Sequence, residues 1–208
     1  MLNIVDLGQF IIDGNELGII ENVNLLIAAQ ADPIVIINDG LLSGMNVVGE
    51  KFKNGEMFVP EVLMAARAMN AGMDIVKPLI ADKDMPTLGT IVIGTVKGDL
   101  HDIGKNLVVM MLESAGFKVV DLGVDTKVEQ FIAAVKENNA DIVGMSAMLT
   151  TTMTYMQEII NACENEGLNV QYLVGGAPLS PVYSKKIGAV YAADASGAVD
   201  TAKELAAS

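Results

Sequence analysis

The chain has 208 residues, 51% of them hydrophobic and 19% charged, which is enough apolar material for a buried core and excludes an intrinsically disordered chain. Its 13 basic and 26 acidic residues give a formal net charge of −13 at pH 7, so phosphate backbones and anionic lipids should repel it, and we expect it to bind neither nucleic acid nor a membrane. One cysteine, Cys163, excludes an intrachain disulfide, and because no signal peptide or membrane span is recognisable, we expect a cytoplasmic protein.

Residues 1–81 have apolar residues at helical spacing. A short helix is predicted at 2–12, and longer apolar series run over 19–27, 34–48 and 62–76. Asp32-Pro33 stands just before the 34–48 series, and proline at the first helical position favours a helix start there. We therefore predict a four-helix bundle over residues 1–81, followed by a polar, proline-containing linker at 82–88.

From residue 89 onward, short β-branched runs alternate with amphipathic helical runs. The predicted strands are 90–96, 118–122, 141–146, 171–174 and 189–192, and the predicted helices are 104–115, 127–138, 151–166 and 197–206. Such alternation is typical of a parallel sheet with helices on both faces. We expect residues 89–208 to form a flavodoxin-like (Rossmann-like) α/β domain with a five-stranded parallel sheet.

The chemically informative residues follow three of the predicted strands. Ligands of doubly wound sheets bind at the carboxyl ends of the strands, near the switch point between the first and third strands. The loop after the first strand contains the only histidine, His101, and Asp99 two positions before it; the loop after the third strand, 146–152, is rich in hydroxyl groups, and the fourth strand ends in Gly175-Gly176. We expect these segments to meet at one edge of the sheet and form a ligand pocket.

The first of these loops does not match the known phosphate-binding motifs. Gly98 and Gly104 are one position too far apart for a P-loop, Lys105 is not followed by Ser or Thr, and no G-x-G-x-x-G is present. Each of these glycines taken alone is more often a turn residue. A phosphoacceptor receiver domain is excluded because the third strand ends in Ser146 and the fourth in Gly175.

Asp99 and His101 form an Asp-x-His pair. In such a pair one imidazole nitrogen can bind a metal while the carboxylate accepts a hydrogen bond from the other. One histidine cannot form a zinc or iron site by itself, and Cys163 lies far away on a predicted helix. The residues alone leave two interpretations open: a solvated turn histidine, or an axial ligand to a metal already held in an equatorial ring.

Three separated segments together resemble a known family. Asp99-Leu-His-Asp-Ile-Gly104, Ser146-Ala-Met148 and Gly175-Gly176 are similar, in order and spacing, to the D-x-H-x-x-G, S-x-L and G-G elements of cobalamin-binding domains. Residues 49–61 resemble the helical cap that precedes this domain in methionine synthase and in small corrinoid proteins of methylamine and O-demethylase methyltransferase systems. The resemblance covers essentially the whole chain and implies a corrinoid protein of anaerobic one-carbon metabolism.

The resemblance also implies a role for individual residues. His101 would be the lower axial cobalt ligand of a cobalamin or related cobamide bound base-off and His-on, with Asp99 on the other imidazole nitrogen and Thr152 supporting Asp99. The other implied cofactor-binding residues are Leu100, Asp102, Ile103, Gly104, Ser146, Met148, Thr150, Gly175 and Gly176. The cap residues implied to cover the upper face are Phe52, Val59, Val62 and Leu63, for which ordinary bundle core is the alternative.

The function implied is that of a methyl carrier, the corrinoid subunit of a multicomponent methyltransferase that has no catalytic residues of its own. A substrate-specific methyltransferase acting on an aryl methyl ether, a methylamine or a betaine would methylate Co(I). The resulting methyl-Co(III) would pass the group to an acceptor methyltransferase serving tetrahydrofolate or a thiol, and a reductive activase would maintain Co(I). A cobalamin store, a cobalamin sensor and a mutase subunit remain the alternatives.

Overall fold

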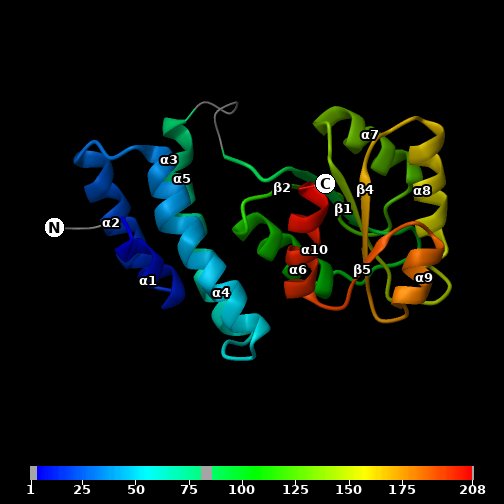
Figure 1. Ribbon diagram of the computed structural model, residues 1–208, viewed down its shortest axis with the longest axis horizontal. Helices are drawn as coiled ribbons and strands as arrows, with labels where there is room; N and C mark the ends of the chain where they lie inside the picture. Colours follow the sequence, from blue (N-terminus) through cyan, green and yellow to red (C-terminus); the bar gives the residue numbers. More distant parts are fainter. Residues whose placement is uncertain (1–3, 81–85, 208) are drawn as a thin grey trace. The chain divides into compact units, whose positions relative to one another are not determined.

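The computed structural model describes residues 4–80 and 86–207, which form two compact units whose main boundary lies between Pro86 and Thr87 (Figure 1). Residues 82–85 of the predicted linker lie outside the described residues. The first unit is entirely helical, and the second alternates strands with helices. None of the described helices combines the length and the apolar character needed to cross a membrane.

The helical unit contains four helical segments in its described part, as the apolar spacing predicts. Their elements are α1 (Asp6–Ile12), α2 (Glu16–Ala28), α3 (Pro33–Val35), the π-helix η1 (Ile36–Leu42), α4 (Ser43–Lys53), α5 (Val59–Val76) and the 3₁₀ turn η2 (Lys77–Leu79). The elements α3, η1 and α4 follow one another without a break. Asp32 caps the start of this continuous segment, because its carboxylate accepts a hydrogen bond from the Ile34 amide at 2.8 Å, and Pro33 occupies the first turn.

The core of this unit is built from the apolar faces of its helices. Its fully buried members include Leu7, Ile11, Ile19, Val23, Leu41, Val48, Val62 and Val76. Helix α2 packs along α5, and α1 packs against α4. The second contact is close because two glycines meet there: a Cβ placed on Gly44 would lie 2.9 Å from the Gly8 Cα.

The second unit is a five-stranded parallel sheet between two helical layers. Its strands are β1 (Thr90–Thr95), β2 (Lys118–Asp121), β3 (Ile142–Ser146), β4 (Gln171–Gly175) and β5 (Val190–Ala192), in the order β2-β1-β3-β4-β5. Its helices are α6 (Ile103–Ser114), α7 (Val128–Asn138), α8 (Tyr155–Asn165), α9 (Pro181–Lys186) and α10 (Ala195–Ala206). Helices α6 and α10 cover one face, and α7, α8 and α9 cover the other (Figure 1). This order is the flavodoxin-like one and confirms the predicted fold.

The strand register sets the position of the site. Thr95 at the end of β1 pairs with Ser146 at the end of β3, and Ser146 pairs with Gly175 at the end of β4. Three loops therefore leave the sheet at the same level on its carboxyl edge. Behind them lies a hydrophobic core that includes Phe131 and Ile159, both fully buried, which makes this edge a rigid base for the loops.

Two features of the second unit differ from the sequence-based prediction. Helix α9, which has only six residues, was not predicted because so short a segment shows little periodicity. Helix α8 begins at Tyr155 rather than at Thr151, because residues 150–154 form turns. The later start leaves Thr152 in the loop, where its side chain can reach the other strand ends.

Candidate functional site

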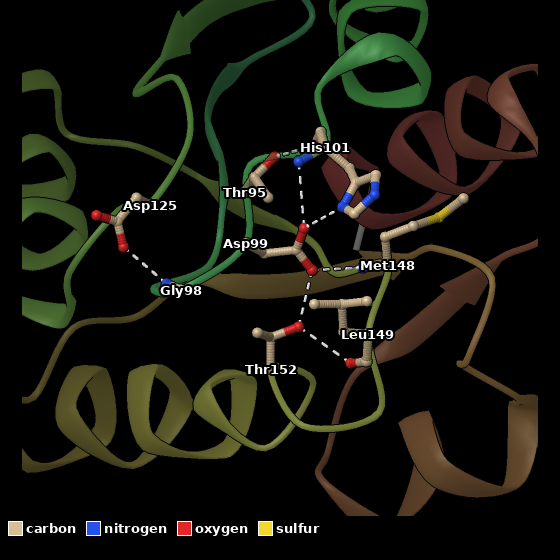
Figure 2. A network of polar contacts seen from close by, with 8 residues as sticks. All are labelled: Thr95, Gly98, Asp99, His101, Asp125, Met148, Leu149 and Thr152. Carbon is tan, nitrogen blue, oxygen red and sulfur yellow. Dashed lines mark hydrogen bonds and ion pairs between the residues drawn. The ribbon is translucent and has the colours of Figure 1, made fainter.

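His101 and Asp99 lie in the loop between β1 and α6 and are in direct contact. The Asp99 side chain is fully buried, whereas the His101 side chain is 57% exposed. The His101 Nδ1 lies 2.7 Å from Asp99 Oδ1, and the His101 amide donates to the same oxygen at 3.2 Å (Figure 2). The second ring nitrogen, Nε2, is on the side of the ring away from Asp99. The carboxylate thus holds the ring from the buried side.

The other Asp99 oxygen is held by the segment that follows β3. Oδ2 accepts hydrogen bonds from the Met148 amide and from the Thr152 hydroxyl, each at 2.7 Å. Burial by itself raises the pKa of the Asp99 carboxyl, but the hydrogen bonds from Met148, His101 and Thr152 outweigh it and lower the pKa well below its usual range. Asp99 is therefore a carboxylate at neutral pH and a permanent acceptor for the imidazole N–H.

The backbone of the His101 loop is held by two residues to which the sequence analysis gave no role. The buried Thr95 hydroxyl donates to the His101 carbonyl oxygen at 2.9 Å. Asp125, in the loop between β2 and α7, accepts from the Gly98 amide at 2.7 Å and donates its own amide to the Asp99 carbonyl at 3.0 Å. Neither residue is marked by a motif, and only the folded geometry brings them to the loop.

Lys105 does not have the function of a phosphate-binding lysine. It is buried at the start of α6, and its Nζ contacts both carboxylate oxygens of Asp121 at 2.6 and 2.7 Å and the Asn106 side-chain oxygen at 2.8 Å. The ammonium group is therefore occupied within the protein. Its ion pair fastens the start of α6 to the end of β2, which agrees with the exclusion of a P-loop.

The other predicted residues between β1 and the start of α6 are exposed. Four apolar side chains, two from this segment and two from the loop after β3, reach solvent with between 42% and 87% of each exposed: Leu100, Ile103, Met148 and Leu149. Exposed apolar groups in such a cluster are typical of a ligand-binding surface. Asp102 is also exposed and accepts a hydrogen bond from the Asn106 side chain at 3.1 Å. A Cβ placed on Gly104 would meet nothing within 4 Å, so the surface at that glycine is open.

The ends of β3 and β4 lie beside this loop. Ser146 and Gly175 are half-buried neighbours in the sheet, whereas Thr150 is exposed in the turn after β3. Gly176 has φ +129°, and a Cβ there would lie 1.8 Å from the Ala147 carbonyl oxygen. Only glycine fits at that position, because any side chain would force the ends of β3 and β4 apart.

The four predicted cap residues lie in the helical unit, around the connection from α4 to α5. Phe52 and Leu63 are half-buried, Val59 is 39% exposed and Val62 is fully buried. Val62 therefore fits the bundle-core interpretation by its burial. That the four cover a cofactor face stays a prediction.

The chemistry of the His101 site fits a metal that brings most of its own ligands. Within residues 4–80 and 86–207 no group of three or more His, Cys, Asp or Glu side chains could hold a metal ion, and Cys163 is buried in the core. An oriented imidazole, an exposed apolar cluster and an open glycine surface suit a large, mostly apolar ring with one free axial position.

Comparison with known proteins points the same way. Two family models, both described as a B12 binding domain, match residues 89–202 and 5–77. The chain is 47% identical over 182 residues to dimethylamine corrinoid protein 1 of Methanosarcina acetivorans, covering 86% of this chain and 85% of that protein. It is 44% identical over 206 residues to a corrinoid protein of Desulfitobacterium hafniense, covering 96% and 95%. A chain in the crystal structure of the methanol:cobalamin methyltransferase complex of Methanosarcina barkeri superposes with a TM-score of 0.91 at 33% identity, covering 98% of this chain and 79% of that one.

Proposed function

The chain belongs to the family of B12-binding corrinoid proteins, and from that premise we propose that it carries a methyl group on a bound corrinoid between two partner methyltransferases. The observation that carries the proposal is the exposed His101 imidazole held by the buried Asp99 carboxylate. When bound, the corrinoid supplies a cobalt centre that accepts and releases the methyl group. The protein supplies the ligand, its orientation and an exposed apolar surface for the ring.

In this proposal His101 would be the protein's ligand to the cobalt, in the base-off, His-on mode of cofactor binding. Donation of the Nδ1 proton to Asp99 leaves the lone pair on Nε2, the nitrogen on the side away from the carboxylate. Asp99 thus fixes the tautomer and the orientation of the imidazole, and Thr152 and Met148 keep Asp99 in place.

The other residues of the edge are assigned to the corrinoid ring and its tail. Leu100, Ile103 and Met148 offer exposed apolar contacts for the ring. Gly104 gives the nucleotide tail an open surface to pass. Polar groups and glycines assigned to the ring edge and the tail are Asp102, Ser146, Thr150, Gly175 and Gly176. The opposite face would be covered by Phe52, Val59 and Leu63, with the fully buried Val62 packed beneath them in the bundle core.

The partners follow from the carrier role. A substrate-specific methyltransferase delivers the methyl group, an acceptor methyltransferase serving tetrahydrofolate or a thiol removes it, and a reductive activase maintains the reduced cofactor. A methylamine is the best-supported donor, because a relative with 47% identity is named for dimethylamine. A chain that superposes with a TM-score of 0.91 comes from a complex named for methanol, so we take the donor to be set by the partner enzyme.

Reconstitution with hydroxocobalamin tests the proposal. The wild-type protein should retain the corrinoid with visible absorption bands of histidine ligation, and His101→Ala should lose those bands. The loaded protein, chemically reduced, should then accept a methyl group from dimethylamine only when a dimethylamine methyltransferase is added. Corrinoid binding without methyl acceptance from any methylated donor would support the storage or sensor alternative. A wild-type protein that retains no corrinoid would refute the proposal at its centre.

A further inference from the structure

Asp125 has a backbone conformation that is uncommon for a residue with a side chain. Its φ is +51°, in the left-handed region, where Asp and Asn are among the few non-glycine residues tolerated. Gly98, which it contacts, has φ +80° and is also left-handed. Two left-handed residues from different loops thus face one another beside the Asp99–His101 pair (Figure 2).

The left-handed conformation lets Asp125 bind the same short segment in two ways. Its carboxylate accepts from the Gly98 amide at 2.7 Å, and its own amide donates to the Asp99 carbonyl at 3.0 Å. The residues before and after Asp125 in the chain are joined to β1 by main-chain hydrogen bonds. The Thr95 amide donates to the Gly123 carbonyl, and the Thr126 amide donates to the Thr95 carbonyl, each at 2.9 Å. The loop between β2 and α7 therefore holds the backbone on which Asp99 stands.

We propose that Asp125 is a positioning residue for the axial ligand: it fixes the backbone at Gly98 and Asp99 so that the Asp99 carboxylate meets His101 on one side and Thr152 on the other. This inference rests on the proposed function, because it takes His101 as the ligand. The Asp125 carboxylate bonds to the Gly98 amide and not to the imidazole, so it acts through the Asp99 backbone.

The geometry of Asp99 explains why such fixing matters. One carboxylate oxygen contacts His101 Nδ1 and the other contacts Met148 and Thr152, which come from a different loop. A rotation of the 98–99 peptide would move both oxygens and break contacts on at least one side. Hydrogen bonds weaken steeply with such misalignment, so the hold on the imidazole proton depends on that peptide.

Three substitutions separate the contributions of Asp125. Asp125→Asn keeps an acceptor oxygen and tolerates the left-handed backbone but removes the charge. Asp125→Gly keeps the backbone conformation and removes the acceptor. Asp125→Ala removes the acceptor and strains the backbone. Comparison of Asn with Gly therefore isolates the hydrogen bond to Gly98, and comparison of Gly with Ala isolates the conformation.

The readout is the tautomer of the imidazole in the cofactor-free protein. His101 is the only histidine of the chain, so ¹⁵N NMR at one alkaline pH reports a single ring. We expect the Nδ1–H tautomer in wild type and in Asp125→Asn. In Asp125→Gly the ratio of the Nε2–H to the Nδ1–H tautomer should rise about fivefold, the scale of losing one well-formed hydrogen bond. After loading with hydroxocobalamin, the fraction with histidine ligation should fall in Asp125→Gly and be rescued in Asp125→Asn.

Each outcome decides the inference. An unchanged tautomer in a folded Asp125→Gly protein overturns it, and so does an Asp125→Asn protein that behaves like Asp125→Gly, because charge rather than the hydrogen bond would then act. Should Asp125→Gly not fold, hydrogen exchange of the Gly98 amide in wild type decides: slow exchange supports the inference, and exchange at the rate of a free loop amide overturns it. If the variants show the expected tautomer ratios but the wild-type protein does not bind corrinoid, the proposed function is refuted and the positioning of the imidazole by Asp125 still stands.

Discussion

Replacement of Thr152 by valine should destabilise the α/β unit, because Thr152 donates to a carboxylate that is fully buried. Valine keeps the shape of the side chain and removes only the hydroxyl, which lies 2.7 Å from Asp99 Oδ2. A hydrogen bond to a charged group contributes about 1.5–3 kcal/mol, so we expect a loss of about 2 kcal/mol. For a unit of this size such a loss lowers the Tm by roughly 6–10 °C.

The positions of the tyrosines allow this loss of stability to be measured in the α/β unit. It has no tryptophan, and its four tyrosines, Tyr155, Tyr172, Tyr183 and Tyr191, all lie in the α/β unit. Tyrosine fluorescence, and circular dichroism in the tyrosine absorption band, therefore report in urea on that unit. Thr152→Ser is the matched control, since it keeps the hydroxyl and should lose only the packing of one methyl group, about 0.8 kcal/mol. If the free energy of unfolding of the valine variant lies within about 0.5 kcal/mol of the wild-type value, the usual range for a neutral surface change, the reasoning is refuted.

The contribution of Asp99 to the stability of the folded protein should be lost in acid. Hydrogen bonding lowers the pKa of Asp99 in the folded state, so the stability it contributes is fully present above the ordinary Asp pKa of about 3.9 and is lost as the pH falls through the lower folded value. The valine variant lacks one of these hydrogen bonds. The difference between its free energy of unfolding and that of the wild type should thus be constant from neutral pH down to about 5 and shrink only in stronger acid.

Three further predictions concern other positions. Gly176→Ala should cost about 3 kcal/mol or more, or prevent folding, because its Cβ would lie 1.8 Å from a carbonyl oxygen. Gly175→Ala should cost much less, because its Cβ would lie 3.4 Å from the Ala192 carbonyl; equal melting curves for the two variants would contradict this. His101→Ala should lower the free energy of unfolding by only about 1 kcal/mol, less than Thr152→Val, because the ring is 57% exposed, water can replace it at Asp99 Oδ1, and the backbone amide still donates to that oxygen. The histidine-ligated corrinoid bands should disappear in this variant; retained bands would exclude His101 as the ligand. Burial raises the pKa of the Cys163 thiol, so iodoacetamide should label it only as fast as the α/β unit unfolds, and rapid labelling of the native protein would contradict its burial.

The meeting of Asp99, His101 and Thr152 could be predicted from the sequence because it depends on strand order. Alternating strands and helices specify a parallel sheet, and a parallel sheet places the carboxyl ends of β1 and β3 side by side. Strand order therefore predicts that these loops meet, whereas the particular contacts of Asp99 with His101 and Thr152 are implied only by the resemblance to cobalamin-binding domains.

The supports of the loop could not be predicted in the same way. The contact of Asp125 with Gly98 depends on two left-handed residues from different loops, and no periodic pattern marks either one. The buried ion pair of Lys105 with Asp121 depends on how α6 packs against β2. Likewise, the π-helix Ile36–Leu42 has apolar spacing that seven residues cannot distinguish from that of an α-helix. These features arise from tertiary packing, which local sequence does not encode.

The hydrogen bond from Met148 to Asp99 comes from the main chain, and this has a consequence for how such proteins can vary. The Met148 amide donates at 2.7 Å, while the Met148 side chain is 47% exposed. The anchor on the carboxylate is therefore present whichever non-proline residue occupies position 148, provided the loop keeps its path. Under the proposed function, the side chain at position 148 can therefore be exchanged to suit a different cobamide while Asp99 keeps its hold on the imidazole.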